Sequence, residues 1–297
     1  MKNILRHWYV VPIIVVGILA IAGTARLVNH SKVAIIATPK SNTVDVTDST
    51  KWSVSFSDDF KGTQLDNSKW VTCYDWQNPS ENGCTNGGNA EQQWYTPDQV
   101  TVKDGVATLT AIKQPVTVPS VPSPITYGYQ SGMISTGRAY PDASEKWSAS
   151  YGYFESRIKV QGGTGIWPAF WLLPIDRSWP PEIDIMELVG SRPQEVLQTY
   201  HWLDSANQKQ KSEFVATSDD YTKGWHTYAV NWQPQRIDWY IDGKLTRTAT
   251  GDAVPNKPME IILNLAVGGR LPGNADETTP FPRAMLIDYV RVYGMKQ

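Results

Sequence analysis

The sequence has few of the residues that commonly bind metals or nucleic acids. Its 297 residues include four histidines and two cysteines, and the histidines are too scattered for the ligand spacing of a zinc site. The formal net charge is −2, with neither a basic excess nor an acidic tail. A basic surface for nucleic acid is therefore excluded, and this charge balance favours a neutral partner.

Amphipathic helices and repeats of fixed period are also missing from the sequence. Short runs of alternating apolar residues, separated by turns rich in Gly, Pro and Asn, are typical of an all-β sandwich or barrel. Two hairpins are predicted where Asp104-Gly105 and Asp242-Gly243 interrupt such runs, because both dipeptides suit a tight hairpin turn. Further strands are expected at 151–160, 225–232, 259–267 and 286–293.

Residues 1–25 have the layout of an export signal, in which Lys2 and Arg6 precede an apolar run that ends in small residues. The run is close to the length of a membrane span, so a retained N-terminal membrane anchor is the alternative to a cleaved signal peptide. A polar linker is expected over 26–50 and one domain over 51–297. We therefore expect a monomer that is secreted or extracytoplasmic. It is released if the N-terminal segment is cleaved, and it is anchored in the membrane if that segment is retained.

The two cysteines, Cys73 and Cys84, lie close together in the sequence. The segment between them contains the turn signals Asn78-Pro79 and Asn82-Gly83, so it is predicted to be a loop. In an exported protein, such a pair favours a disulfide across the loop. Two free thiols are the alternative.

Tryptophan and tyrosine are abundant, with 13 and 14 residues against only 6 phenylalanines. Their rings combine a flat apolar face with a polar edge, and sugars offer a matching surface of apolar faces and hydroxyl rims. About half of these rings are expected to pack in the core, since tryptophan is mostly buried in folded proteins. The remainder are candidates for contact with carbohydrate.

The densest group of carboxylates is the segment Glu182-Ile183-Asp184-Ile185-Met186-Glu187. In a strand, Glu182 and Asp184 share the face opposite to the two isoleucines. Strict alternation would bury Glu187 in the core without a partner, which is costly. A β-bulge at Ile185-Met186 is therefore predicted, because it returns Glu187 to the acidic face.

Three carboxylates in one row raise the pKa of at least one of them by mutual repulsion. A glycosidase needs such a pair near neutral pH, one carboxyl ionised and one protonated. A calcium-binding or solvated acidic edge is the alternative for this segment.

The acidic segment resembles the signature of glycoside hydrolase family 16, in the bulged form typical of its laminarinase-like branch. Four further segments resemble the family in the same order, at 89–95, 165–174, 262–269 and 287–293. The resemblance implies a concanavalin-like jelly roll, a β-sandwich of two curved antiparallel sheets with a cleft on the concave face. Laminarinases usually carry a Trp after the Val-Gly-Gly segment, whereas this chain has Arg270-Leu271-Pro272. The resemblance therefore does not assign the substrate subsite that this loop serves.

The resemblance assigns a catalytic role to three residues: Glu182 matches the nucleophile, Glu187 the general acid/base, and Asp184 the acid that hydrogen-bonds the nucleophile. It also implies substrate contacts from residues spread over the chain, namely Trp167, Trp171, Trp179, His201, Asn89, Glu91, Glu155, Arg157 and Asn264. Core packing is the alternative for the tryptophans, a structural role for His201, and an ordinary ion pair for Glu155 with Arg157.

Asp59, Gly105 and Asp288 resemble positions that bind a structural calcium ion on the convex side of many family members. Asp59 stands where many relatives have Glu, and oxygen ligands of this kind suit calcium. Surface acids without a metal are the alternative. No cofactor is expected for catalysis.

The implied activity is the retaining, endo-acting hydrolysis of a neutral β-glucan, with β-1,3-glucan favoured, through a covalent glycosyl-enzyme. Three alternatives use the same fold: an agar or carrageenan galactanase, a β-glucan transglycosylase, and a non-catalytic carbohydrate-binding protein. The aligned carboxylates favour catalysis over binding alone. The charge balance offers no attraction for a sulfated galactan.

Overall fold

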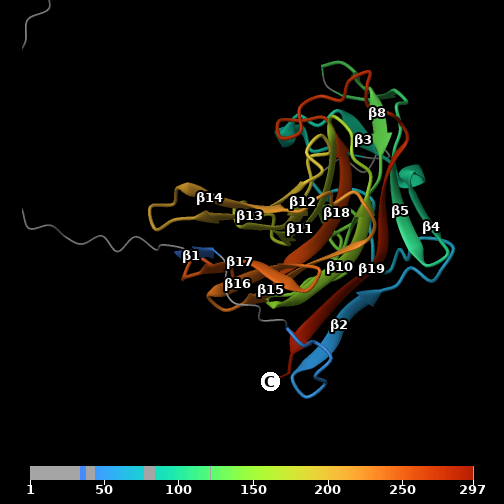
Figure 1. The fold of residues 1–297 in the computed structure, drawn as a ribbon. Coiled ribbons are helices and arrows are strands. Elements are labelled where there is room, and N and C mark those ends of the chain that lie inside the picture. The colour runs from blue at the N-terminus through green and yellow to red at the C-terminus, as the bar shows by residue number, and fades with distance from the viewer. Residues whose placement is uncertain (1–33, 38–43, 77–83, 121, 297) are drawn as a thin grey trace, which may run out of the picture.

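The computed structural model describes residues 34–37, 44–76, 84–120 and 122–296 (Figure 1). In this part of the chain the regular structure is β, apart from two short 3₁₀ helices, η2 (Gly87–Asn89) and η3 (Pro97–Gln99). No helix among these residues is long and apolar enough to cross a membrane. The predicted export segment, residues 1–25, lies outside the described residues.

Two large antiparallel sheets make up the body of the molecule (Figure 1). The nine-stranded sheet follows the spatial order β1 (Ala34–Ala37), β17 (Lys244–Thr250), β16 (Arg236–Ile241), β15 (His226–Gln233), β10 (Gly152–Val160), β19 (Arg283–Met295), β5 (Val106–Ala111) and β4 (Val100–Lys103), while β2 (Trp52–Asp58) also pairs with β19. The six-stranded sheet follows the order β14 (Lys209–Thr217), β13 (Glu195–Leu203), β12 (Glu182–Glu187), β11 (Ile166–Pro174), β18 (Met259–Val267) and β9 (Met133–Ser135).

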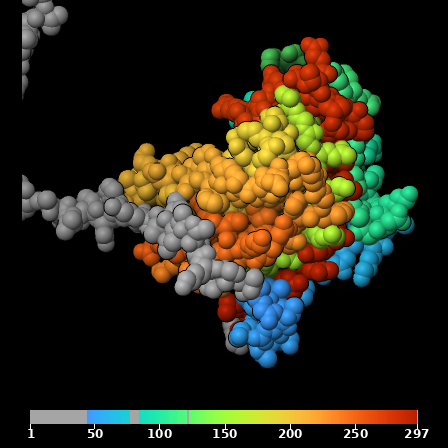
Figure 2. All heavy atoms as spheres, in the orientation of Figure 1, coloured from blue at the N-terminus to red at the C-terminus, as the bar shows by residue number. Residues whose placement is uncertain are grey.

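Two small strand pairs complete the fold. β3 (Gln93–Tyr95) pairs in parallel with β8 (Tyr129–Ser131), and β6 (Val116–Val118) pairs antiparallel with β7 (Ile125–Tyr127). The β13–β14 hairpin extends beyond the body of the molecule as an arm, which is gold in Figures 1 and 2. The expected all-β jelly roll of two antiparallel sheets is confirmed.

The main hydrophobic core fills the space between the two large sheets. Strand β11 shows how the sequence divides between faces, since Phe170 and Leu172 are fully buried in this core. Their neighbours Trp167 and Trp171 point to the outer face of the six-stranded sheet, where they are 8% exposed. Both faces of this strand are therefore covered, which is why its sequence is almost continuously apolar.

Both predicted hairpins are present, between β4 and β5 and between β16 and β17. Their turn residues all have positive φ angles, 53° at Asp104 and 79° at Gly105, then 50° at Asp242 and 72° at Gly243. Two successive positive φ angles match the twist of the flanking strands, and Asp-Gly adopts them at little cost.

The segment 26–50, expected to be a polar linker, contains one strand and two packed side chains among its described residues. Ala34–Ala37 forms β1, which pairs with the edge strand β17 so that Ala34 lies opposite Thr250. Val44 and Val46 pack against a buried cluster around Trp52 on the outer face of the nine-stranded sheet. The folded domain therefore begins before residue 51, because these residues cover an edge and a face that would otherwise be open.

Cys73 and Cys84 are both free cysteines in the structure, so the expected disulfide is not formed there. Cys84 is fully buried, and its Sγ accepts a hydrogen bond from the Tyr74 amide at 3.3 Å. The side chain of Cys73 contacts it, and burial raises the pKa of Cys84 well above its usual range. The two thiols are therefore neighbours, and a disulfide in the exported protein stays a prediction.

We expect mass spectrometry of unreduced peptides from exported protein to find Cys73 joined to Cys84. The bridge would close a loop of about a dozen residues, for which the chain-entropy model gives roughly 3 kcal/mol of stability. Reduction should lower the free energy of unfolding of the wild type but leave that of Cys73→Ala/Cys84→Ala unchanged. Two alkylatable thiols in native exported material would contradict the prediction.

Candidate active site

A cleft of about 630 Å³ lies on the outer face of the six-stranded sheet. Its floor is built by β11, β12, β13, β14 and β18, and loops on either side form its walls. The lining includes seven residues expected from the sequence in addition to the three acids, namely Trp167, Trp171, Trp179, His201, Asn89, Glu91 and Asn264. The structure therefore brings most of the predicted site into one place.

The predicted bulge in β12 is confirmed. Along β13, Asp184 lies opposite Thr199 and Glu187 lies opposite Leu197, so two residues of β12 oppose the single residue Gln198. The extra residue restores Glu187 to the face that carries Glu182 and Asp184, and all three acids line the cleft. Ile185 and Met186 are both fully buried in the core, as a bulge of this kind requires.

Trp179 and His201 are the neighbours of Glu182 that favour its ionised form. The indole Nε1 of Trp179 donates a hydrogen bond to Glu182 Oε2 at 2.9 Å. His201 Nε2 lies 3.5 Å from Glu182 Oε1 and 3.5 Å from Asp184 Oδ2. The hydrogen bond from Asp184 to Glu182 that the resemblance implies stays a prediction.

Glu187 lies between two donors on neighbouring strands. Trp167 Nε1 donates to Glu187 Oε1 at 3.2 Å, and Thr199 Oγ1 donates to Glu187 Oε2 at 3.4 Å. These contacts come from β11 on one side and β13 on the other. They fix the carboxyl group on the cleft side of the sheet.

Burial raises the pKa of every acid in the row, and repulsion from Asp184 adds to this effect at Glu182 and Glu187. Burial, with repulsion from Asp184, raises the pKa of Glu187 to about 8. Burial likewise raises the pKa of Asp184 to about 7, although Lys211 and Arg247 act in the opposite direction. The pKa of Glu182 is raised well above its usual range by burial and Asp184, while His201 and Trp179 lower it. Glu187 therefore retains its proton near neutral pH, as an acid catalyst requires.

A chain of hydrogen bonds orients the polar groups on the β18 side of the cleft. Trp171 Nε1 donates to Asn264 Oδ1 at 2.8 Å, and Asn264 Nδ2 donates to the Tyr95 hydroxyl at 3.0 Å. Tyr95 and Asn89 in turn donate to Glu91, at 3.2 and 3.1 Å. Burial raises the pKa of Glu91. This wall presents fixed amide and carboxyl groups, which suit the recognition of sugar hydroxyls.

The loop that follows β18 holds this wall in place. Gly268 has a φ of 70°, and a Cβ atom there would lie 2.3 Å from the side chain of Gln92. The Arg270 amide donates to the Asn89 carbonyl at 2.9 Å, and Leu271 lines the cleft. Where a Trp is usual in laminarinases, this chain thus places an aliphatic side chain at the cleft.

Several cleft residues were not expected from the sequence. Trp76 is 37% exposed and stacks on Tyr74, with ring centroids 4.3 Å apart and planes inclined by 14°. Lys211 and Glu213 reach the cleft from β14 and form an ion pair of 2.9 Å. The alternation of these two residues with Gln210 and Ser212 was the available signal, but the strand is too polar to be recognised from apolar periodicity.

The expectation that Glu155 and Arg157 line the cleft is wrong. Both lie on β10 in the nine-stranded sheet, away from the cleft. Glu155 accepts a hydrogen bond from the Tyr289 hydroxyl at 2.8 Å, and Arg157 pairs with Asp288 at 2.7 Å. Alternation along a strand shows which residues share a face, but not which sheet the strand joins.

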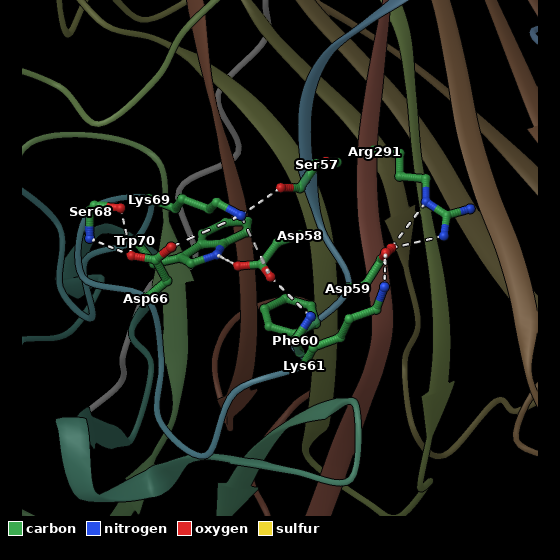
Figure 3. A network of polar contacts seen from close by, with 10 residues as sticks. All are labelled: Ser57, Asp58, Asp59, Phe60, Lys61, Asp66, Ser68, Lys69, Trp70 and Arg291. Carbon is green, nitrogen blue, oxygen red and sulfur yellow. Dashed lines mark hydrogen bonds and ion pairs between the residues drawn. The ribbon is translucent and has the colours of Figure 1, made fainter.

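The residues expected to bind calcium are engaged in other contacts. A Cβ atom on Gly105 would lie 3.9 Å from the Asp59 carbonyl oxygen, so these two residues are adjacent. The Asp59 carboxylate, however, accepts a hydrogen bond from Arg291 Nη2 at 2.8 Å (Figure 3). Asp288 is paired with Arg157. In this arrangement the side-chain donors do not fit a calcium ion, because each carboxylate already neutralises a guanidinium group.

Glu182, Asp184 and His201 are the one group of three donors in the described part of the chain that could close around a metal ion. Their donor atoms lie within 4.8 Å of one another. The acid row, however, supplies both a nucleophile and a proton donor from side chains. The chemistry that the row supports therefore needs no cofactor.

Replacing Glu187 with Gln should change how the free energy of unfolding depends on pH. The pKa of Glu187 is about 8 in the folded protein and near 4.5 in the unfolded chain, so folding favours the protonated form. The contribution of this proton to the free energy of unfolding is therefore complete below about pH 4.5 and is lost as the pH rises through 8. An amide does not ionise. The variant should therefore gain stability relative to wild type between pH 5 and 8.5, by on the order of a few kcal/mol.

Denaturant unfolding at a series of pH values measures this difference. Glu195→Gln is the matched control, because Glu195 is partly exposed and paired with Arg192 at 2.7 Å. Parallel pH profiles for Glu187→Gln and wild type would contradict the prediction.

Comparison with known proteins agrees with this geometry. The model for glycosyl hydrolases family 16 matches residues 88–291. An endo-1,3-1,4-β-glycanase of Rhizobium meliloti is 33% identical over 255 residues, which cover 82% of this chain and 52% of the relative. A glucan endo-1,3-β-glucosidase of Niallia circulans is 33% identical over 261 residues, covering 80% of this chain and 37% of the relative. This chain thus spans about half the length of the first of these relatives, or less for the second.

Solved structures give the same result. The laminarinase catalytic domain of Thermotoga maritima superposes with a TM-score of 0.69 at 30% identity, covering 83% of this chain and 99% of that one. The endo-β-1,3-glucanase of Pyrococcus furiosus gives 0.69 at 31% identity, covering 88% and 100%. With the family match extending over both large sheets and the acid row, the chain belongs to glycosyl hydrolase family 16.

Proposed function

We propose that this chain is an endo-acting β-glucanase that cleaves with retention of configuration, and that its substrate is β-1,3-glucan. The observation that carries the proposal is the bulged row of Glu182, Asp184 and Glu187 on the floor of an open cleft. The bulge buries both Ile185 and Met186 in the core and shifts the following residue to the cleft face. It places both glutamates on one face beside a shared third acid.

The proposed reaction has two steps, and Glu187 acts as general acid in the first and as general base in the second. Glu182, as the carboxylate, attacks the anomeric carbon while Glu187 gives its proton to the departing glycosidic oxygen. A covalent glycosyl ester forms on Glu182, and one chain leaves with a new hydroxyl group. Glu187, now ionised, takes a proton from water, whose oxygen attacks the same carbon and releases Glu182. The Trp179 and His201 contacts support the ionised nucleophile, and burial supports the protonated acid.

The charge of the cleft supports a neutral substrate. The lysine and the arginine in its lining are both paired, Lys211 with Glu213 at 2.9 Å and Arg177 with Asp75 at 3.1 Å. Neither of these two is left to bind a sulfate ester. Trp76 and Trp179 are exposed rings suited to contact with sugars, and the Lys209 ammonium group lies 4.3 Å from the centre of the Trp179 ring. Relatives named as endo-1,3-β-glucanases or laminarinases, at about 30% identity, favour the β-1,3 linkage.

We further propose that the protein acts outside the cytoplasm as a monomer. The export signal predicted over 1–25 supports this location. A long polymeric substrate, which does not cross membranes, is consistent with it.

Digestion of laminarin tests the proposed function. We expect a series of short oligosaccharides from the start of the reaction, with slower cleavage of mixed-linkage β-glucan and none of agarose or xyloglucan. Glu182→Gln, whose amide cannot form the glycosyl ester, should lose several orders of magnitude in kcat while keeping the fold. More than a few per cent of residual activity in this variant would remove Glu182 from the role of nucleophile. Cleavage of agarose but not of laminarin would overturn the proposal that β-1,3-glucan is the substrate.

Azide should rescue Glu187→Ala. The variant lacks the proton donor, so its loss of activity should be largest on glucan and small on an activated aryl glycoside, whose phenol leaves without a proton. Azide can then attack the glycosyl-enzyme without a general base, and retention predicts a β-glycosyl azide. Nuclear magnetic resonance of the product distinguishes the outcomes. An α-azide would indicate inversion, and no rescue would remove Glu187 from the acid/base role.

A further inference from the structure

Arg247 is a charged side chain buried in the core between the two sheets. It belongs to β17 of the nine-stranded sheet and is only 1% exposed. No carboxylate of the described residues lies within ion-pair distance, 4.0 Å, of its guanidinium group. Burial lowers its pKa to about 10. A buried cation without an adjacent anion is costly, so its presence calls for a physical reason.

The guanidinium group joins the two sheets through backbone oxygens. Its Nη1 donates to the carbonyl of Gln198 on β13, and its Nη2 donates to the carbonyl of Ser212 on β14 at 3.1 Å. The ring of Trp239 lies 4.5 Å from its Cζ atom. The neighbouring Thr246 hydroxyl donates to Gln198 Oε1 at 2.7 Å. Two residues of β17 thus bind both the backbone and the side chain of Gln198.

Gln198 is the residue that opposes the bulge. It lies between Thr199, the partner of Asp184, and Leu197, the partner of Glu187. At a bulge the regular ladder is interrupted, so the backbone there depends on other contacts for its position. Arg247 and Thr246 supply such contacts from the opposite sheet.

The peptide unit that Arg247 binds also carries the residue that hydrogen-bonds the general acid. The carbonyl held by Arg247 belongs to the peptide bond between Gln198 and Thr199, and Thr199 Oγ1 donates to Glu187 Oε2 at 3.4 Å. On the other side of the bulge, Trp239 Nε1 donates to the Asp184 carbonyl at 2.9 Å. The cation and the ring on which it stacks therefore hold both flanks of the bulge from behind.

The charge of Arg247 also complements the acid row through the sheet. Its electrostatic partners are Asp184 on β12 and Glu213 on β14, both on the cleft face. Outside the row, Lys211 and Glu213 of β14 and His201 of β13 are the charged or titratable groups that act on the acids from the cleft itself. Asp184 and Glu213 therefore supply the negative charge that compensates the guanidinium group.

We propose that Arg247 is a positioning residue for the reaction, one that holds the bulge from the core and thereby keeps Glu187 in place as general acid. This inference rests on the proposed function and adds a residue on the opposite sheet to it. Arg247 touches neither substrate nor reacting atoms, and it acts through the Gln198–Thr199 peptide.

Kinetics of Arg247→Met on two substrates tests the proposal. On laminarin we expect kcat to fall by about 100-fold with little change in KM, as for a catalytic group displaced by about 1 Å. On an activated aryl glycoside, which needs no proton donor, the loss should stay within about threefold. In a Glu187→Ala background the substitution should cost no further activity. Equal losses on both substrates, or an additive loss in the double variant, would overturn the proposal.

Two further variants separate positioning from folding. Arg236→Met is the matched control, because Arg236 lies on the neighbouring strand β16 and pairs with Asp238 at 2.7 Å near the surface. It should leave both activities unchanged. Arg247→Lys keeps the charge but cannot donate to both carbonyls, so it should show the same difference between substrates to a smaller extent. If Arg247→Met does not fold, the kinetics of Arg247→Lys replace it as the test. Equal losses of activity on laminarin and on the aryl glycoside in that variant would overturn the proposal.

Hydrogen exchange provides a readout that does not depend on activity. In Arg247→Lys and in folded Arg247→Met, backbone amides at 185–187 and 198–199 should exchange at least about tenfold faster than in wild type, because the bulge loses its support. Unchanged protection would overturn the proposal even if laminarin proves not to be the substrate. Increased exchange with no activity on any glucan would leave the positioning role intact and reject the proposed function instead.

Discussion

Burial of three neighbouring carboxyl groups on one strand is the constraint on which the site depends. A strand that carries Glu182, Asp184 and Glu187 on one face would relax if it could, by rotating an acid away or by admitting water. It is prevented from doing so on every side. Trp179, His201 and Trp167 bind the carboxyl groups from the cleft, and the isoleucines and Met186 anchor the strand in the core. The electrostatic cost is thus met by packing and hydrogen bonds, and the result is that Glu187 retains its proton near neutral pH.

The bulge shows how one inserted residue can change chemistry without changing the fold. Without it, Glu187 would point between the sheets, and β12 would present two acids to the cleft rather than three. With it, the register shifts in the pairings of β12 with β11 and with β13, whereas the pairings farther out, from β14 at one edge to β9 at the other, remain regular. The local irregularity is confined to one position, where the opposite sheet reaches across to support it. Support from a second layer is available only because the fold is a sandwich.

The sequence predicted features that depend on local pattern and missed those that depend on which segments meet. The Asp-Gly hairpins, the bulge and the shared face of the acids all follow from spacing along the chain. Glu155 and Arg157 have the alternation of site residues, but their strand belongs to the other sheet. The strand carrying Lys211 was missed because a polar sheet edge has no apolar periodicity. Tyr74 and Trp76 form a stacked pair near the cleft that only the path of the loop reveals. Arg247 could not be found either, since a lone arginine in a strand is ordinarily assumed to face water.

The place of β1 has a consequence for access. This strand, Ala34–Ala37, is the outermost member of the nine-stranded sheet, whereas the cleft opens on the outer face of the six-stranded sheet. The first described strand therefore lies in the layer behind the cleft and leaves the open side of the cleft clear. A polymer too long to thread through a narrow entrance can lie across that side without meeting this strand.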